Sequence, residues 1–127
     1  MINAYAKAGG MEAVKDKGTD TKALDYRIAL VGNPNVGKSV LFGLFTGKYV
    51  TVSNYPGTTV EVSRGMYSGS NNTIEVVDTP GANSLISHSE DERVARDILL
   101  RDEEQKIIQV IDSKNLHRGL MITTQLA

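Results

Sequence analysis

One stretch of eight residues, Gly32–Ser39, constrains this chain more than any other. It reads Gly-Asn-Pro-Asn-Val-Gly-Lys-Ser and fits the phosphate-loop pattern G-x-x-x-x-G-K-[ST] at every fixed position. The apolar run 28–31 precedes it and the helix-compatible stretch 40–45 follows it, which is the strand–loop–helix context that the pattern requires. The alternative is a tight strand-to-helix turn with an incidental lysine. The flanking pattern favours a loop whose backbone N–H groups enclose phosphate oxygens.

The chemistry of phosphate binding suggests a role for each part of this loop. Gly32 and Gly37 allow the backbone to curl, and the helix that follows adds the positive end of its dipole. Lys38 is predicted to place its charge on the β- and γ-phosphates, and the Ser39 hydroxyl is predicted to ligate Mg²⁺. The predicted nucleotide contacts in this region are Asn33, Asn35, Val36, Gly37, Lys38, Ser39 and Val40.

A second motif, Asp78-Thr79-Pro80-Gly81, follows an apolar strand predicted at 73–77. Asp78 is placed like a Walker-B aspartate, to hold Mg²⁺ directly or through a water. Gly81 is expected to offer its backbone N–H to the γ-phosphate, where a side chain would crowd it. A plain turn is the alternative, because proline and glycine are turn formers. The position of the motif at a strand end, about 40 residues after the phosphate loop, favours the functional interpretation.

A polar stretch, 48–59, is predicted to be a loop without regular structure, a length that is uncommon unless the loop has a function. Thr58 and Thr59 are both candidates for a residue that reaches Mg²⁺ and the γ-phosphate only in the triphosphate state. The alternative is that both are ordinary residues at the entrance to a strand, where threonine is common.

The hydrophobic pattern predicts the element order β-α-β-β-α-β-α, with Ser89 as a helix N-cap and Glu92 as its capping-box partner. The predicted strands are 26–31, 60–67, 73–77 and 106–111, and the predicted helices run to about Thr46, over 90–101 and over 115–126. This order indicates a three-layer α/β fold with a mostly parallel sheet and a ligand crevice at the carboxyl ends of its strands. Residues 1–25 are predicted to form an N-terminal arm or linker, and 26–127 the domain.

Composition excludes several other classes of function. The net charge of −1 and the lack of a Lys/Arg block argue against a nucleic-acid partner. There are no cysteines, so disulfides and thiolate metal sites are excluded. No apolar run approaches the roughly 20 residues that cross a bilayer, and we expect the chain as given to be cytoplasmic. His88 and His117 are isolated, and we expect them to be surface or structural residues.

Together these motifs resemble a translation-factor-type GTPase, and more narrowly the cytosolic G domain of the ferrous iron transport protein B family, over about residues 26–126. Ser84-Leu85 together with Ser89–Asp97 resembles the second switch of that family and the helix that follows it. Asp112–Leu120 together with Thr124–Leu126 resembles the segment after its fourth core strand. Ribosome-assembly GTPases share the first motif, but they usually have Thr-Thr-Arg-Asp where this chain has Thr58-Thr59-Val60-Glu61.

The resemblance implies a Ras-like G domain of the P-loop NTPase class that binds GTP or GDP with Mg²⁺. It implies that Thr59 is the switch-I threonine and a Mg²⁺ ligand, together with Ser39 and Asp78, and that Asn35 ligates a K⁺ ion beside the phosphates. Lys38, Thr59 and Gly81 are then the catalytic residues, and Thr58 joins Thr59, Asp78 and Gly81 among the nucleotide contacts. Ala82 has no side chain that could orient the attacking water, so we expect hydrolysis to be slow.

The family's guanine-reading motif, Asn-Lys-x-Asp, is expected after the next strand, and the sequence ends at Ala127 before it. We therefore expect a partial G domain, incomplete on its C-terminal side, with weak affinity and poor discrimination of GTP from ATP. The strand at 106–111 would then be an open sheet edge available for self-association. The expected partner is the membrane portion of the transporter, which would place the domain at the cytoplasmic face of the membrane. Two alternatives are a non-catalytic interaction module and a fragment of a ribosome-associated GTPase.

Overall fold

The computed structural model describes residues 24–47, 50–67, 72–101 and 104–127. Its elements in chain order are β1 (Tyr26–Gly32), α2 (Lys38–Thr46), β2 (Val50–Asn54), β3 (Glu61–Tyr67), β4 (Ile74–Asp78), α3 (Glu90–Leu100), β5 (Lys106–Val110), the short 3-10 helix η2 (Ser113–Asn115) and α4 (Leu116–Leu126). The predicted strands and the last two helices have bounds within one residue of those observed. Most of the predicted N-terminal arm lies outside the described residues.

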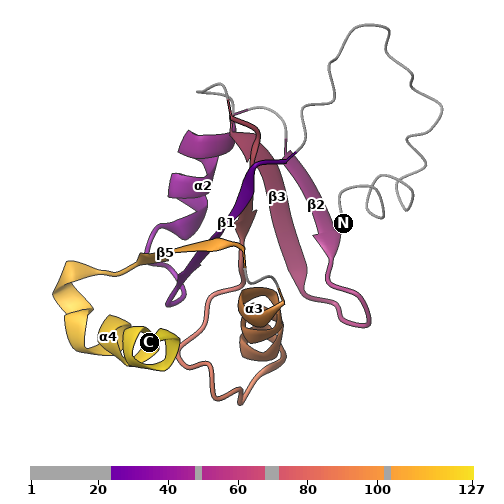
Figure 1. Ribbon diagram of the computed structural model, residues 1–127. Coiled ribbons are helices and arrows are strands. Elements are labelled where there is room, and N and C mark those ends of the chain that lie inside the picture. The colour runs from indigo at the N-terminus through magenta and orange to yellow at the C-terminus, as the bar shows by residue number, and fades with distance from the viewer. Residues whose placement is uncertain (1–23, 48–49, 68–71, 102–103) are drawn as a thin grey trace, which may run out of the picture.

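The five strands form one mixed sheet in the order β2-β3-β4-β1-β5 (Figure 1). β1 is parallel to β4 and β5, whereas β2 and β3 pair antiparallel with each other and β3 pairs antiparallel with β4. In the β1–β4 register Leu30 lies opposite Asp78, so the last residue of β4 is level with the last residues of β1 before the phosphate loop. The carboxyl ends of these parallel strands therefore meet at one edge of the sheet, where ligands bind in such folds.

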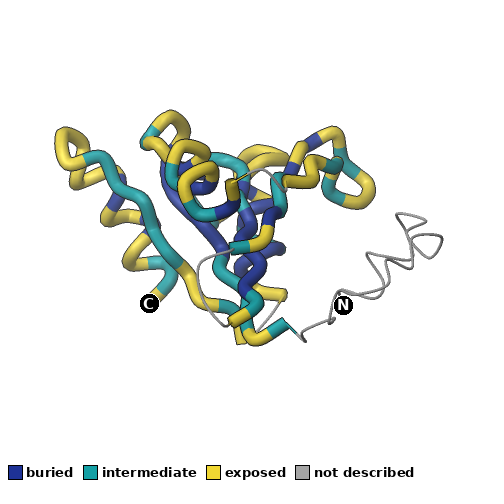
Figure 2. The backbone as a smooth tube through the Cα atoms, turned by 90° about the horizontal axis from the view of Figure 1, so that it is seen from above, coloured by how far each residue is buried: buried dark blue, intermediate teal, exposed yellow. Residues whose placement is uncertain are grey.

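Helices cover both faces of the central strands, which confirms the three-layer arrangement. Alternate residues of β1 point to opposite faces: Ala29 and Val31 pack with Leu99 of α3 and Ile122 of α4. Leu30 packs on the other face with Phe42 of α2. Figure 2 shows the buried residues gathered along the central strands, with exposed residues at the periphery. A strand covered on both faces reads as a continuous apolar run, which is why the β1 sequence could be recognised.

The prediction that 48–59 lacks regular structure is wrong for 50–54, which form β2. β2 is an outer strand, bonded only to β3 among the described strands. Val50 and Val52 are 41% and 55% exposed, so β2 buries no apolar face that would mark it as a strand. Its alternating valine and threonine residues favour extended backbone, but without burial this propensity is a weak signal.

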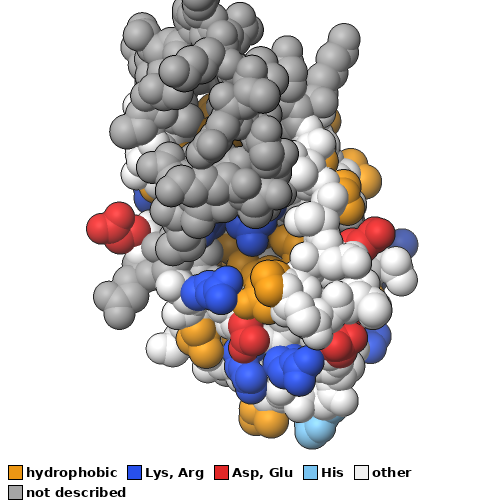
Figure 3. Space-filling view, turned by 90° about the vertical axis from the view of Figure 1, so that its right-hand side faces the viewer, with side chains coloured by type: hydrophobic (Ala, Val, Ile, Leu, Met, Phe, Trp, Pro, Cys, Tyr) orange, Lys and Arg blue, Asp and Glu red, His pale blue; other side chains and the backbone are white. Residues whose placement is uncertain are grey.

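Two surface features bear on the kind of partner. Within the described ranges, no helix has the length and apolar character needed to cross a membrane. Acidic and basic side chains are interspersed on the described part of the face in Figure 3, with no large field of one sign.

Candidate functional site

The phosphate loop leaves the end of β1 and enters α2 through two residues with left-handed backbone. Asn35 has φ 62° and Gly37 has φ 99°. Such angles favour glycine and are tolerated by asparagine, and they curl the chain around its own N–H groups. Gly32 is constrained differently, because a Cβ atom there would collide with the carbonyl oxygen of Val110 in β5. Glycine is therefore needed at 37 for its backbone conformation and at 32 because a side chain would collide with β5.

The loop side chains differ in their exposure. Lys38, the first residue of α2, is only 7% exposed, whereas Ser39 and Asn35 are exposed. Val40 is 71% exposed, so it stands on the outer side of the first helical turn. Val36 is half-buried, and its Cγ2 lies close to Gly32.

Asn33 has a role that sequence reasoning missed. Its side chain is buried and donates from Nδ2 to the Ala82 carbonyl and to Asn83 Oδ1, both at 3.3 Å. The Asn33 amide therefore ties the phosphate loop to the segment after Gly81. The nucleotide contact predicted for Asn33 would have to come from its backbone.

Ser39 and Asp78 come together as the spacing predicted. Ser39 Oγ donates to Asp78 Oδ2 at 2.7 Å, and the other carboxylate oxygen, Oδ1, is buried without a hydrogen-bond partner among the described residues. A buried carboxylate oxygen of this kind is costly unless it is satisfied. A hydroxyl and a carboxylate are the oxygen donors that Mg²⁺ takes in phosphate-loop sites, so this pair fits the predicted ion.

The turn after Asp78 is fixed to the end of β1 and to the phosphate loop. Thr79 is buried, and both its Oγ1 and its N–H donate to the Leu30 carbonyl, at 2.7 and 3.2 Å. Ala82 N–H donates to the Gly32 carbonyl at 3.0 Å. A Cβ atom on Gly81 would lie 2.8 Å from Pro34 Cα. The structure thus requires glycine at 81 for its packing on the loop, in addition to the phosphate contact predicted for it.

The two threonine candidates have different surroundings. Thr58 Oγ1 donates to the Tyr55 carbonyl at 2.9 Å and accepts from Val60 N–H at 3.1 Å, so its hydroxyl stabilises the turn 55–60. Thr59 is exposed and lines a groove of about 470 Å³. The other residues that line this groove are Val60, Glu61, Pro80, Gly81, Glu90 and Asp91. Thr59, rather than Thr58, therefore lies beside Gly81.

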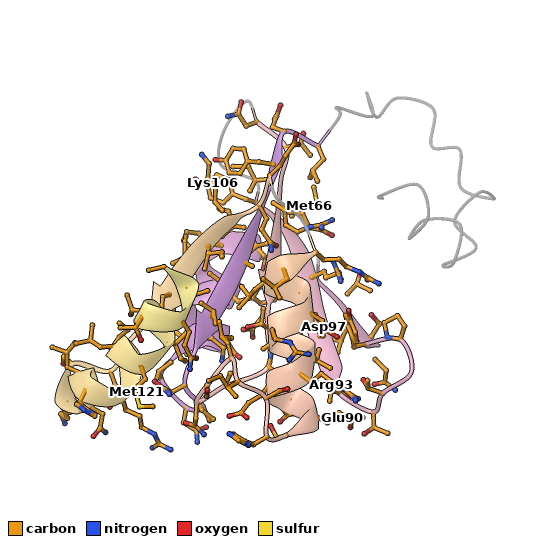
Figure 4. The ribbon with its side chains drawn as sticks, turned by 60° about the horizontal axis from the view of Figure 1, so that its bottom comes forward. Met66, Glu90, Arg93, Asp97, Lys106 and Met121 are labelled. Atoms are coloured by element: carbon orange, nitrogen blue, oxygen red, sulfur yellow. The ribbon has the colours of Figure 1, made fainter. Side chains whose placement is uncertain are left out.

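The groove ends at the first turn of α3. Figure 4 labels Glu90 and Arg93 there, and Arg93 Nη2 lies 3.5 Å from Glu90 Oε1. Both side chains are about half exposed, so this ion pair contributes little to stability.

Glu92 organises the segment that leads into α3. Ser89 is the N-cap as predicted, since its Oγ accepts from Glu92 N–H at 3.2 Å. The Glu92 carboxylate reaches past the cap and accepts from His88 N–H at 2.9 Å and from Asn83 N–H at 3.2 Å. The bond from His88 is the largest cause that lowers the pKa of Glu92, and burial opposes it. The capping-box pattern identified Glu92, but not its reach to residue 83.

Comparisons with known proteins agree with this geometry. The family model described as ferrous iron transport protein B matches residues 26–127. The chain is 43% identical over 101 residues to the Fe(2+) transporter FeoB of Methanocaldococcus jannaschii, an alignment that covers 80% of this chain and 15% of that protein. It is 40% identical over 103 residues to FeoB of Escherichia coli K12, covering 78% of this chain and 13% of that one.

Solved structures give the same picture. The crystal structure of the G domain of the T. maritima FeoB iron transporter has a TM-score of 0.75 and 40% identity, and the match covers 80% of this chain and 64% of that one. A mutant of S. thermophilus NFeoB bound to GDP has a TM-score of 0.73 and 45% identity, with coverages of 80% and 38%. The fold is therefore that of the P-loop NTPase G domains, and the match spans 64% of the T. maritima G domain. These matches favour the iron-transport family over the ribosome-assembly GTPases.

Proposed function

The chain belongs to the family of ferrous iron transport protein B, and from that premise we propose that it binds GTP with Mg²⁺ and hydrolyses it as the regulatory nucleotide-binding part of a ferrous iron transporter. The chain spans only 15% and 13% of the two curated relatives reported above, so transport itself would reside in the rest of such a protein.

The observation that carries this proposal is the 2.7 Å contact between Ser39 Oγ and Asp78 Oδ2 beside the unsatisfied Asp78 Oδ1. These two residues would hold Mg²⁺, which supplies positive charge for the β- and γ-phosphate oxygens. Lys38, at the start of α2, adds a second charge, and the N–H groups of the curled loop line the phosphates. Thr59 and Gly81 share one groove and would sense the γ-phosphate from two sides.

We expect GTP hydrolysis by this chain to be slow. Ala82 follows Gly81 and is fully buried, and its N–H is bonded to Gly32, so it cannot orient a water. Catalysis would then depend on fixed charges and backbone donors that stabilise the developing negative charge. Asn35, exposed and with left-handed backbone in the loop, would ligate K⁺, a role supported by the family resemblance.

The test is equilibrium binding and turnover of GTP and ATP, each in K⁺ and in Na⁺. Lys38→Ala should abolish triphosphate binding, whereas Lys114→Ala, which removes an exposed lysine in η2, should leave it unchanged. Replacing K⁺ with Na⁺ should slow GTP turnover if Asn35 holds a potassium ion. If Lys38→Ala and the wild type bound GTP equally well, the phosphate loop would not be the nucleotide site.

A non-catalytic role in self-association is the second candidate, because β5 is an outer strand among the strands that the structure describes and its Ile107 is 41% exposed. Unpaired edges of this kind can pair with another chain. Sedimentation velocity of the wild type and of Ile107→Lys would test it. A dimer that dissociates on this substitution would support edge pairing, and a wild-type monomer would reject it. In either case we place the domain on the cytoplasmic side of the membrane that carries the transporter.

A further inference from the structure

The side chain of Gln125, in the last turn of α4, is hydrogen-bonded to the segment that follows Gly81. Gln125 Oε1 accepts from Leu85 N–H at 2.7 Å and from the Ser84 hydroxyl at 3.3 Å. Gln125 Nε2 donates to Ser84 Oγ at 3.0 Å. The backbone N–H of Leu85 can only donate, so it fixes which end of the amide faces it. Ser84 Oγ also accepts from Ile86 N–H at 3.0 Å, so the amide of Gln125 holds a turn of backbone in one conformation.

The helix that carries Gln125 is itself fixed to β5. Gln109 Nε2 donates to the Gly119 carbonyl, and Thr123 Oγ1 donates to Gln109 Oε1, both at 2.7 Å. Gly119 lies so close to Ile111 that any Cβ there would collide with its side chain. α4 is therefore held in place by contacts that do not involve the segment after Gly81, and Gln125 projects from a fixed support.

The opposite end of the same segment rests on the phosphate loop. Ala82 N–H is bonded to the Gly32 carbonyl, and Gly81 packs against Pro34. The partly buried Leu85 also packs against the cluster that joins β1, α3 and α4. Figure 1 shows this segment running between the end of β4 and the start of α3, next to the C-terminus of α4. Only a few residues separate Gly81 from Leu85, so holding one end restricts the other.

We propose that Gln125 is a positioning residue for the γ-phosphate contact: its amide holds Ser84 and Leu85 and so keeps Gly81 against the phosphate loop. The inference rests on the proposed function, in which the Gly81 N–H contacts the γ-phosphate. A diphosphate has no group at that position, so the restraint favours triphosphate binding alone. The gain is entropic, because a segment that is already ordered loses less freedom when the ligand binds.

The experiment compares Gln125→Leu with wild type by titration with a non-hydrolysable GTP analogue and with GDP, both with Mg²⁺. Removing hydrogen bonds of this kind should weaken analogue binding by about three- to tenfold. GDP affinity should stay within about twofold. Gln125→Glu keeps an acceptor for Leu85 N–H and should recover most of the analogue affinity. Thr124→Val is the matched control, since it removes an exposed hydrogen bond within α4, to the Met121 carbonyl, and touches neither β5 nor the segment after Gly81; it should leave both affinities unchanged.

Amide hydrogen exchange separates this inference from the proposed function, because it needs no nucleotide. The Leu85 amide should exchange faster in Gln125→Leu than in wild type, and Gln125→Glu should restore its protection. Unchanged exchange at Leu85 would overturn the restraint. If the wild type binds neither nucleotide, the proposed function fails and the coupling fails with it, whatever the exchange shows. If both nucleotides bind and Gln125→Leu leaves the ratio of their affinities unchanged, the coupling is wrong while the proposed function stands.

Discussion

Two segments border the predicted γ-phosphate position, and they are held in different ways. The segment 79–89 is bonded to β1, the phosphate loop, α3 and α4 through side chains and backbone groups far apart in sequence. The segment 55–60 is held by local bonds: Tyr55 N–H donates to Val60 O at 2.8 Å and Thr58 N–H donates to Tyr55 O at 3.0 Å. Its contacts with the rest of the fold are at its two ends: Val60 is a buried member of the cluster that it forms with β3, β4 and α3, and Tyr55 packs against that cluster.

This difference indicates that the two segments open at different free-energy cost. Local opening is easiest where few long-range contacts must break. We expect 55–60 to order and disorder around a ligand, as switch segments do, while 79–89 keeps one conformation. The predictions below test this contrast in order of decreasing effect.

Replacing a glycine with alanine should destabilise the protein more in segment 79–89 than in segment 55–60. Gly81→Ala places a Cβ against the backbone of Pro34 and should lower the free energy of unfolding by about 3 kcal/mol. Gly57→Ala puts alanine at φ 76°, where nothing lies within 4 Å, and should cost about 1 kcal/mol. Urea denaturation of both variants measures the difference. Equal losses would contradict the contrast between the segments.

Glu92→Gln should lower the free energy of unfolding by about 2 kcal/mol at neutral pH. The Glu92 carboxylate accepts from two backbone N–H groups, whereas a glutamine has one acceptor oxygen and would turn its NH₂ group toward the other donor. The folded-state pKa of Glu92 is lowered below its ordinary 4.5. Its contribution is therefore fully present above that value and is lost as pH falls through the folded-state pKa. Urea titrations from neutral pH to below about 4 should show the wild type approaching the variant.

Glu90→Gln is the matched control for this pair of measurements. Glu90 begins the same helix but is exposed, so the change should alter stability by less than about 0.5 kcal/mol. If the difference in unfolding free energy between wild type and Glu92→Gln grew on acidification, the pKa of Glu92 would be raised on folding and not lowered.

The two threonines should separate stability from ligand binding. Thr58→Val removes both hydrogen bonds of the turn hydroxyl and should cost about 1 kcal/mol in thermal or urea unfolding. Thr59→Val should leave stability nearly unchanged and should weaken binding of a triphosphate analogue. The reverse result would show that Thr58 is the ligand-facing residue.

The smallest effect is expected at the aromatic contact of 55–60. The Arg101 guanidinium lies 5.8 Å from the centroid of the Tyr55 ring, at an exposed position. Arg101→Ala should therefore cost about 0.5 kcal/mol. Thermal unfolding, with Lys114→Ala as a surface control, would detect it. A loss above about 1 kcal/mol would mean that this segment is anchored more firmly than its local bonds suggest.

Sequence reasoning performed well where a residue's role depends on its neighbours in the chain. The glycine spacing of the phosphate loop, the apolar runs of β1 and β4, and the N-cap Ser89 were all predicted, because each reflects local backbone conformation or burial on both faces. It failed for β2, whose exposed valines carry no burial signal. The residue pattern alone left Thr58 and Thr59 equivalent, since both precede the same strand, and the family resemblance favoured Thr59.

The sequence by itself determined that the curled loop 32–39 and the Asp78 carboxylate would meet at the ends of parallel strands, because spacing and the geometry of such sheets suffice for that. Only the tertiary structure decided which side chains join the pieces. Asn33 reaches Ala82 across 49 positions and Gln125 reaches Ser84 across 41. Such contacts depend on how strands register and how α4 packs on the sheet. These are set by the summed contacts of the whole core, and no local pattern encodes them.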